Sequence, residues 1–240
     1  VRYPPPRWIW AGTAICAIPD IVNHAMLRGW HAYNGVSLKN PKLGFVCTQT
    51  TVAGQPGLEG YYFEYDHELA PEERLRFAPD ESCPLIEPST LPTLDVEMWP
   101  DLRRAKAYRN YAMEYIRNGL PVLIDLLGAT EATRIGRLSG LLVGMQCYDD
   151  IAQRLKITGN DATSFMNLFE RLLLASGDEI SRQDNMIERR AWRLTAGMAD
   201  SESFTSIWRA PFEGLLGVHN RFLEFSQTTG EQFLLRTKSI

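Results

Sequence analysis

The sequence predicts an α+β fold in which a layer of helices packs on an antiparallel sheet of about four strands near the C-terminus. Apolar residues recur at helical spacing from 99 to 175, and the period changes to two after Gly177. Prolines recur between positions 79 and 100, which makes the N-terminal region irregular. We therefore expect a single domain, with 1–100 as an arm, hairpin and Pro-rich connection and 101–240 as the helical and sheet core.

The N-terminal hundred residues contain few regular elements. A triple proline at 4–6 predicts an extended arm, and the next stretch predicts one helix at about 21–33. Two strands are expected at 44–52 and 61–67, joined by the turn-forming sequence at 54–57.

Four helices are expected between 99 and 177. Gly119 and Pro121 predict the end of the first and the start of a short one that ends at Gly128. Thr130 is a suitable N-cap for the third, which runs to about Lys156. The fourth begins at Asn160 or Asp161 and ends at Gly177.

The C-terminal part predicts two hairpins with a helix between them. The first pairs 179–183 with 186–194, and the second pairs 218–228 with 232–238. The intervening helix covers about 203–216 and is interrupted or started by Pro211. Four antiparallel strands in two hairpins can pair into one sheet that the helices cover.

Composition restricts the class of partner. The chain has 240 residues, of which 45% are hydrophobic and 22% charged, as in an ordinary globular protein. Its net charge of -4 gives no electrostatic basis for binding nucleic acid or an anionic membrane. Small molecules and other proteins remain as partners.

The cysteines and the apolar N-terminal run indicate the compartment. Cys16, Cys47, Cys83 and Cys147 form no CxxC pair, so we expect free thiols in a reducing, cytoplasmic location and no metal or other cofactor. The apolar run at 8–27 contains Pro19, Asp20, Asn23 and His24, so we expect neither a membrane span nor a secretion signal.

Three glycines four residues apart are the most unusual local feature. Gly136, Gly140 and Gly144 lie in a strongly helical pattern, where each costs about 1 kcal/mol relative to alanine. Another body approaching the helix backbone closely would offset this cost. That body is either a neighbouring helix or a ligand lying in the groove.

Tyr148, Asp149 and Asp150 continue the same helix. Adjacent carboxylates on a helix point about 100° apart, so they cannot form a facing acid-base dyad. Either one faces a pocket while the other is solvated, or both are solvated.

Two histidines are candidate bases. His67 shares a predicted strand face with Tyr61, Phe63, Tyr65 and Leu69, where it is either buried and hydrogen-bonded or a general base at the rim of an aromatic pocket. His219 and Asn220 follow a predicted helix and open a strand, a junction where side chains often reach a cleft; Glu213 is one carboxylate that could orient His219.

The first hairpin carries a group of cationic and aromatic side chains, Arg189, Arg190, Trp192 and Arg193. An arginine projecting from a sheet is a ready anchor for a substrate carboxylate, whereas cross-strand pairing with Glu179 is the structural alternative. The GxGxxG, P-loop, HExxH, GxSxG and EF-hand patterns are absent from the sequence.

The end of the chain carries a family resemblance. Helices, a hairpin, a helix and a strand precede Thr228, Gly230, Glu231 and Phe233, and this order resembles the L-2-amino-thiazoline-4-carboxylic acid hydrolase-like family over roughly the last 130 residues. Where that family tends to carry Gly-Asp and then a cysteine, this chain has Gly230-Glu231 and then Gln232. The resemblance therefore implies a small-molecule hydrolase without carrying over a thiol.

Two functional hypotheses follow. The first is a hydrolase or lyase that uses acid-base chemistry on a small molecule, in a pocket between the glycine-rich helix and the sheet. Its catalytic candidates are His219, His67, Asp149 and Tyr148, and its substrate-binding candidates are Arg193, Gly140, Gly144, Trp192 and Asn220. The alternative is a non-catalytic protein that binds a small molecule or assembles as a homodimer.

Overall fold

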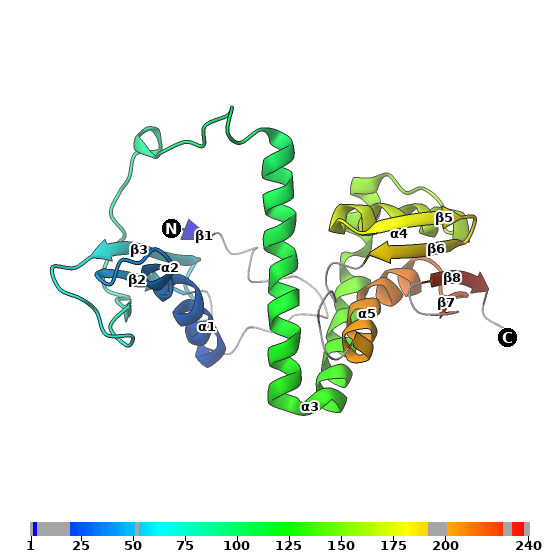
Figure 1. The fold of residues 1–240 in the computed structure, drawn as a ribbon, viewed down its shortest axis with the longest axis horizontal. Coiled ribbons are helices and arrows are strands. Elements are labelled where there is room, and N and C mark those ends of the chain that lie inside the picture. The colour runs from blue at the N-terminus through cyan, green and yellow to red at the C-terminus, as the bar shows by residue number, and fades with distance from the viewer. Residues whose placement is uncertain (1, 4–19, 51–52, 192–200, 228–231, 238–240) are drawn as a thin grey trace. The chain divides into compact units, whose positions relative to one another are not determined.

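The computed structural model describes residues 2–3, 20–50, 53–191, 201–227 and 232–237. Contacts divide the chain into two compact units, 1–93 and 94–240, and each is described separately. The α+β class is confirmed, and the C-terminal unit contains the expected four-stranded antiparallel sheet (Figure 1). The boundary between the units lies close to the expected division at position 100; the single domain stays a prediction.

The N-terminal unit packs short helices on a sheet of its own. The helical part consists of α1 (Asp20–Leu27), the π-helical turn η2 (Arg28–Ala32) and α2 (Asn34–Ser37). The strands are β1 (Arg2–Tyr3), β2 (Leu43–Gln49), β3 (Leu58–Glu64) and β4 (Leu75–Phe77), in the order β1-β3-β2-β4. Only β2 and β3 were predicted, because β1 and β4 are too short to show a period. A 3-10 turn, η4 (Pro88–Thr90), lies in the Pro-rich connection.

The C-terminal unit begins with one long helix, α3 (Asp101–Leu155). The predicted break at Gly119 and Pro121 is wrong, since both lie inside the helix. The break is at Gly128, whose φ of 76° and ψ of 157° are open to glycine but to almost no other residue. Gly128 therefore divides α3 into two helical arms, 101–127 and 129–155.

Two further helices follow. The helix α4 (Ala162–Ser176) begins where predicted, because Asp161 accepts a hydrogen bond from the backbone N of Ser164 at 2.8 Å, and it ends at left-handed Gly177. The helix α5 (Ser201–His219) contains Pro211 without interruption. His219 is thus the last residue of a helix, and its predicted position at the start of a strand is wrong.

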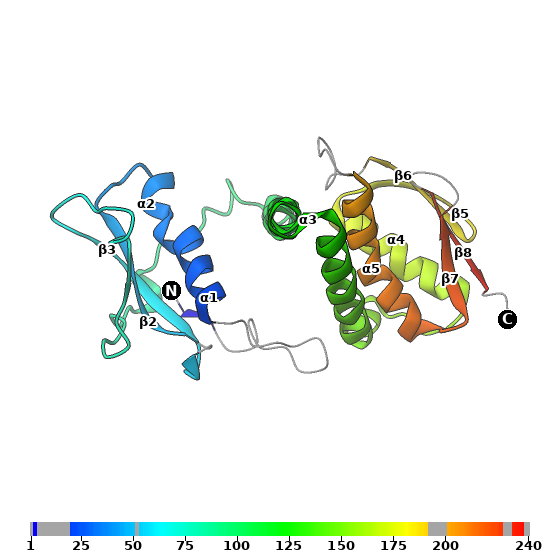
Figure 2. The ribbon, with the colours of Figure 1, turned by 90° about the horizontal axis from the view of Figure 1, so that it is seen from below.

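The C-terminal sheet joins the two predicted hairpins. Strands β5 (Glu179–Gln183) and β6 (Met186–Ala191) form the first, and β7 (Leu223–Gln227) and β8 (Gln232–Thr237) form the second. The order is β5-β6-β8-β7, so β6 pairs with β8. Figure 2 shows α4 and α5 beside one face of this sheet.

An aromatic core lies between those helices and the sheet. The Phe169 ring lies within 5.0–5.5 Å of the rings of Phe212, Phe225 and Phe233, measured between centroids. Aromatic pairs at this spacing add to the stabilisation that burial alone provides. Across the ranges that the structure describes, no helix is both long and apolar enough to cross a membrane.

Candidate functional site

The glycine row on α3 lies against α5. A Cβ added at Gly140 would lie 2.9 Å from Cδ of Pro211. At Gly144 it would lie 2.8 Å from the carbonyl carbon of Pro211, and Gly214 on α5 faces the α3 backbone at Leu141 in return. The neighbouring helix therefore supplies the close approach that the sequence required, and no room for a ligand remains along Gly140.

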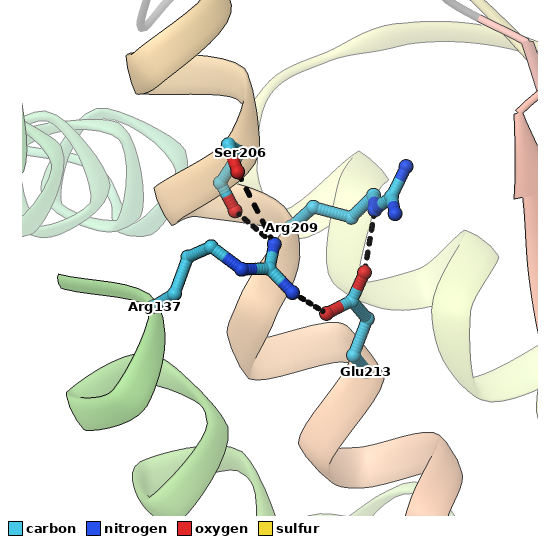
Figure 3. Close-up of polar contacts among 4 residues, drawn as sticks. All are labelled: Arg137, Ser206, Arg209 and Glu213. Carbon is cyan, nitrogen blue, oxygen red and sulfur yellow. Dashed lines mark hydrogen bonds and ion pairs between the residues drawn. The ribbon is translucent and has the colours of Figure 1, made fainter. Parts of the chain in front are cut away.

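An ion-pair cluster holds the same two helices together (Figure 3). The Arg137 guanidinium donates to Oε2 of Glu213 at 2.7 Å and to the carbonyl oxygen of Ser206 at 3.0 Å. Arg209 donates to the other oxygen of Glu213 at 2.6 Å. Both oxygens of Glu213 thus accept from arginines, so the proposed orientation of His219 by Glu213 is not what the structure shows.

His219 instead contacts Tyr148, another candidate from the sequence. Nδ1 of His219 lies 2.7 Å from the Tyr148 hydroxyl, and Nε2 lies 2.9 Å from the carbonyl oxygen of Asp161. A carbonyl can only accept, so Nε2 donates to Asp161, and in the neutral imidazole Nδ1 then accepts from the tyrosine. Burial, helped by the charge of Asp149, raises the pKa of Tyr148, which keeps this hydroxyl a donor.

The pair links three helices rather than facing a ligand. Tyr148 lies on α3, His219 ends α5 and Asp161 caps α4. His219 is 5% exposed, and both ring nitrogens already have partners. Acting as a general base would require His219 to lose one of these bonds, so the geometry favours a structural role.

The other sequence candidates lie apart from this pair. Asp149 and Asp150 are both exposed, which agrees with the alternative in which both carboxylates are solvated. Nδ2 of Asn220 donates to the carbonyl oxygen of Asn160 at 2.8 Å. His67 belongs to the N-terminal unit, where its side chain is 58% exposed and bonds the adjacent Asp66 at 2.8 Å.

The cationic hairpin is only partly described. Trp192 and Arg193 lie outside the described residues, as does Cys16. Arg189 is buried, with Nη1 3.9 Å from Oδ2 of the buried Asp178. Ala191, rather than an arginine, lies opposite Glu179 in the strand register.

A buried histidine that sequence reasoning missed lies in the N-terminal unit. His31 is 5% exposed and its Nδ1 lies 2.8 Å from the hydroxyl of Tyr62, to which Asn34 also donates. Its ring stacks on Phe45 with 4.3 Å between centroids. His31 lies in the π-helical turn η2, a conformation that the apolar pattern of the sequence does not reveal.

The C-terminal unit contains a cavity of about 370 Å³. Both arms of α3 line it, through Met113 on the first and Gly144 and Cys147 on the second, together with α4 and α5. The lining is almost wholly apolar. Burial, with a smaller effect of the Asp150 charge, raises the pKa of the Cys147 thiol, so the thiol stays protonated near neutral pH.

Two nitrogen donors belong to residues that line this cavity. Nε of Arg109 and Nε1 of Trp208 are buried and have no hydrogen-bond partner within the described ranges. The Arg109 guanidinium lies against Gly177, where an added Cβ would come within 3.1 Å of its Cζ. The sequence alone did not identify either residue, because the kink at Gly128 and the packing of α5 bring them together.

Comparisons of the chain with protein-family models, with curated proteins and with solved structures gave no significant match. The family resemblance at the C-terminal end therefore stays a prediction. A search of the described part of the chain found no group of three or more histidine, cysteine or acidic side chains placed to hold a metal ion.

Proposed function

We propose that the C-terminal unit is a binding module that holds a small, largely apolar molecule in the cavity between α3, α4 and α5. The cavity itself carries this proposal. Its volume of about 370 Å³ lies in the range of small-molecule sites, which are mostly apolar with few polar groups. Residues of three helices line it and leave it partly open to solvent, so the site is built from rigid elements.

Binding is favoured over catalysis because the acid-base candidates lie elsewhere. His219 and Tyr148 bond each other and are not among the residues that line the cavity. The Cys147 thiol does line it, but its raised pKa makes it a poor nucleophile at neutral pH. The hydrolase or lyase hypothesis thus has less support than its non-catalytic alternative.

A ligand screen with a filled-cavity variant tests the proposal. Apolar compounds of up to about ten carbons should raise the melting temperature of the full chain, because a ligand of the folded state stabilises by mass action. Ala175 lines the cavity, and Ala175→Leu should abolish most of the shift. Ala105→Leu, at an exposed position of α3, is the matched control and should leave the shift unchanged.

Two outcomes contradict the proposal. One is a screen in which no compound raises the melting temperature of the wild-type chain. The other is a shift that Ala175→Leu and Ala105→Leu preserve equally, because the ligand then binds away from the cavity.

Homo-oligomeric assembly is a second candidate, favoured by an exposed apolar stripe on the first arm of α3. Tyr108, Tyr115 and Val122 are seven residues apart, and their exposed fractions are 72%, 41% and 54%. Heptad spacing of this kind is typical of helices that pair with another helix. Light scattering should then show a dimer that Val122→Glu dissociates; a monomeric wild-type chain would exclude this function.

A further inference from the structure

We propose that the ligand of this cavity carries a carboxylate, which the Arg109 guanidinium and the Trp208 indole N–H bind. This inference rests on the proposed function and specifies the chemistry of the bound molecule. Its body fills the apolar cavity, and its acidic group lies at the end of α4. The ligand is thus a small free organic acid with an apolar chain or ring.

The unpaired state of Arg109 is the first observation. A guanidinium is charged at every accessible pH, and burying one of its donors without an acceptor is costly. Arg134 and Arg137 on the same helix each pair with a glutamate. No described carboxylate pairs with Arg109, although its Nε is buried.

The C-terminus of α4 holds the Arg109 guanidinium in place without accepting a hydrogen bond from its Nε. The partial negative charge at a helix C-terminus favours a nearby cation, and Gly177 gives the guanidinium room to lie against the backbone. Two of the last carbonyls already accept from the chain: Gly177 N donates to Leu174 O at 3.0 Å, and Asp178 N to Leu173 O at 3.1 Å. The guanidinium is therefore positioned, and its buried Nε still lacks an acceptor among the described residues.

Trp208 supplies the second donor. Its ring packs against Phe212 in an edge-on arrangement with 5.6 Å between centroids, and against Met113 on the first arm of α3. Indole nitrogen can only donate, and here it is buried without a partner in the described residues. Trp208 and Arg109 line the same cavity from different helices.

These two groups select the head group of the ligand. Both are donors, and one carries a positive charge, so an amine or another cation is disfavoured. The Ser176 hydroxyl, which also lines the cavity, donates its hydrogen to the carbonyl oxygen of Leu172 at 2.9 Å, so the chain already uses this donor. A carboxylate has two acceptor oxygens and matches the planar fork of a guanidinium.

Titration calorimetry on the full chain with octanoate, octan-1-ol and octylamine tests the inference. Octanoate should bind at least about tenfold more tightly than the alcohol, the difference expected for one charge-assisted interaction. Octylamine should bind weakest. Arg109→Met keeps the apolar stem and should remove the preference for the acid, whereas Trp208→Phe should reduce it by about threefold to tenfold.

Controls separate the site from general effects of charge. Arg134→Met removes a paired arginine of the same helix and should leave the preference for octanoate unchanged. Arg109→Met without ligand should lower the melting temperature by no more than a few degrees, because it removes both an unpaired, partly buried charge and the weak attraction of that charge to the α4 C-terminus. A larger drop would indicate that Arg109 has a structural partner, and would contradict the inference.

The outcomes distinguish the inference from the function on which it rests. If octanol and octanoate bind equally and Ala175→Leu blocks both, the cavity binds apolar molecules and the carboxylate inference is wrong. If none of the three probes binds, both proposals fail. If octanoate binds preferentially but Arg109→Met leaves the preference intact, another group recognises the acid, and the inference is again wrong.

Discussion

Replacing each glycine of α3 by alanine should give a graded series of stabilities. An added Cβ meets nothing within 4 Å at Gly119, side-chain atoms of Ile207 at 2.9–3.0 Å at Gly136, and the backbone of α5 at Gly144. Alanine gains about 1 kcal/mol of helix propensity at each position. The differences within the series therefore measure how closely α5 approaches.

The magnitudes follow from the contacts. Gly119→Ala should stabilise the unit by about 0.5–1 kcal/mol, because nothing opposes the gain in propensity. Gly136→Ala should fall between Gly119→Ala and Gly144→Ala, because the added Cβ meets only side-chain atoms, which belong to the buried, β-branched Ile207. At Gly144 the carbonyl carbon of Pro211 would be 2.8 Å away. To restore an ordinary van der Waals distance of about 3.5–4 Å between the added Cβ and Pro211, α5 would have to move by roughly 1 Å.

Such backbone overlap exceeds the usual cost of overpacking, which is about 1–3 kcal/mol. We expect Gly144→Ala to lose about 2 kcal/mol or more net, or roughly 4–8 °C in melting temperature. Equilibrium urea unfolding followed by circular dichroism measures the series. If the Gly144→Ala variant proved as stable as the Gly119→Ala variant, the close approach of the two helix backbones would be refuted.

Three further predictions concern single side chains. Tyr148→Phe should lower the free energy of unfolding in urea by about 1–2 kcal/mol, because it leaves a buried imidazole acceptor unpaired. Tyr108→Phe, at an exposed position, should change it little, and equal losses in the two variants would contradict the hydrogen bond between Tyr148 and His219. Hydrogen bonds from the backbone N–H and hydroxyl of Ser164 lower the pKa of Asp161 from its ordinary 3.8, so the stability that this cap contributes is present above that pH and is lost as the pH falls further. Asp161→Asn should therefore flatten the decline of the free energy of unfolding below about pH 4. An unchanged dependence of stability on pH in the acid range would contradict this prediction. Burial raises the pKa of the Cys47 thiol to about 11, so maleimide at pH 8 should label Cys83 well before Cys47, and simultaneous labelling of the native chain would contradict the burial.

Local signals in the sequence predicted the parts of the fold that depend on near neighbours. Asp161 and Gly177 mark the ends of α4 because capping depends on residues within one turn. The two-residue turn at 184–185 predicted the β5–β6 hairpin for the same reason. The glycine row predicted that another body approaches α3, although the sequence did not say which.

The features that the sequence did not reveal depend on distant contacts. Pro121 suggested a helix end, yet α3 continues through it, because losing one backbone hydrogen bond does not outweigh the others along a long helix. The strand β4 has three residues and pairs in parallel with β2, so no local pattern marked it. Arg109 and Trp208 are about a hundred positions apart and line one cavity only in the folded chain.

The candidate site was predicted in part. Tyr148 and His219 are both catalytic candidates from the sequence, and the structure brings their side chains together at 2.7 Å. The sequence did not indicate that Asp161 uses the other ring nitrogen, because this contact spans 58 positions. The presence of a polar pair could thus be inferred from residue type, but its structural role required the fold.

The torsion angles of one residue determine whether the cavity exists. As a straight rod, the 55 residues of α3 would extend about 80 Å, and Met113 and Gly144 could never border the same space. Because Gly128 holds a backbone conformation closed to side-chain-bearing residues, a substitution there would alter the shape of the compartment from many residues away. A substitution of Gly128 should therefore weaken ligand binding even though every side chain that lines the cavity is unchanged.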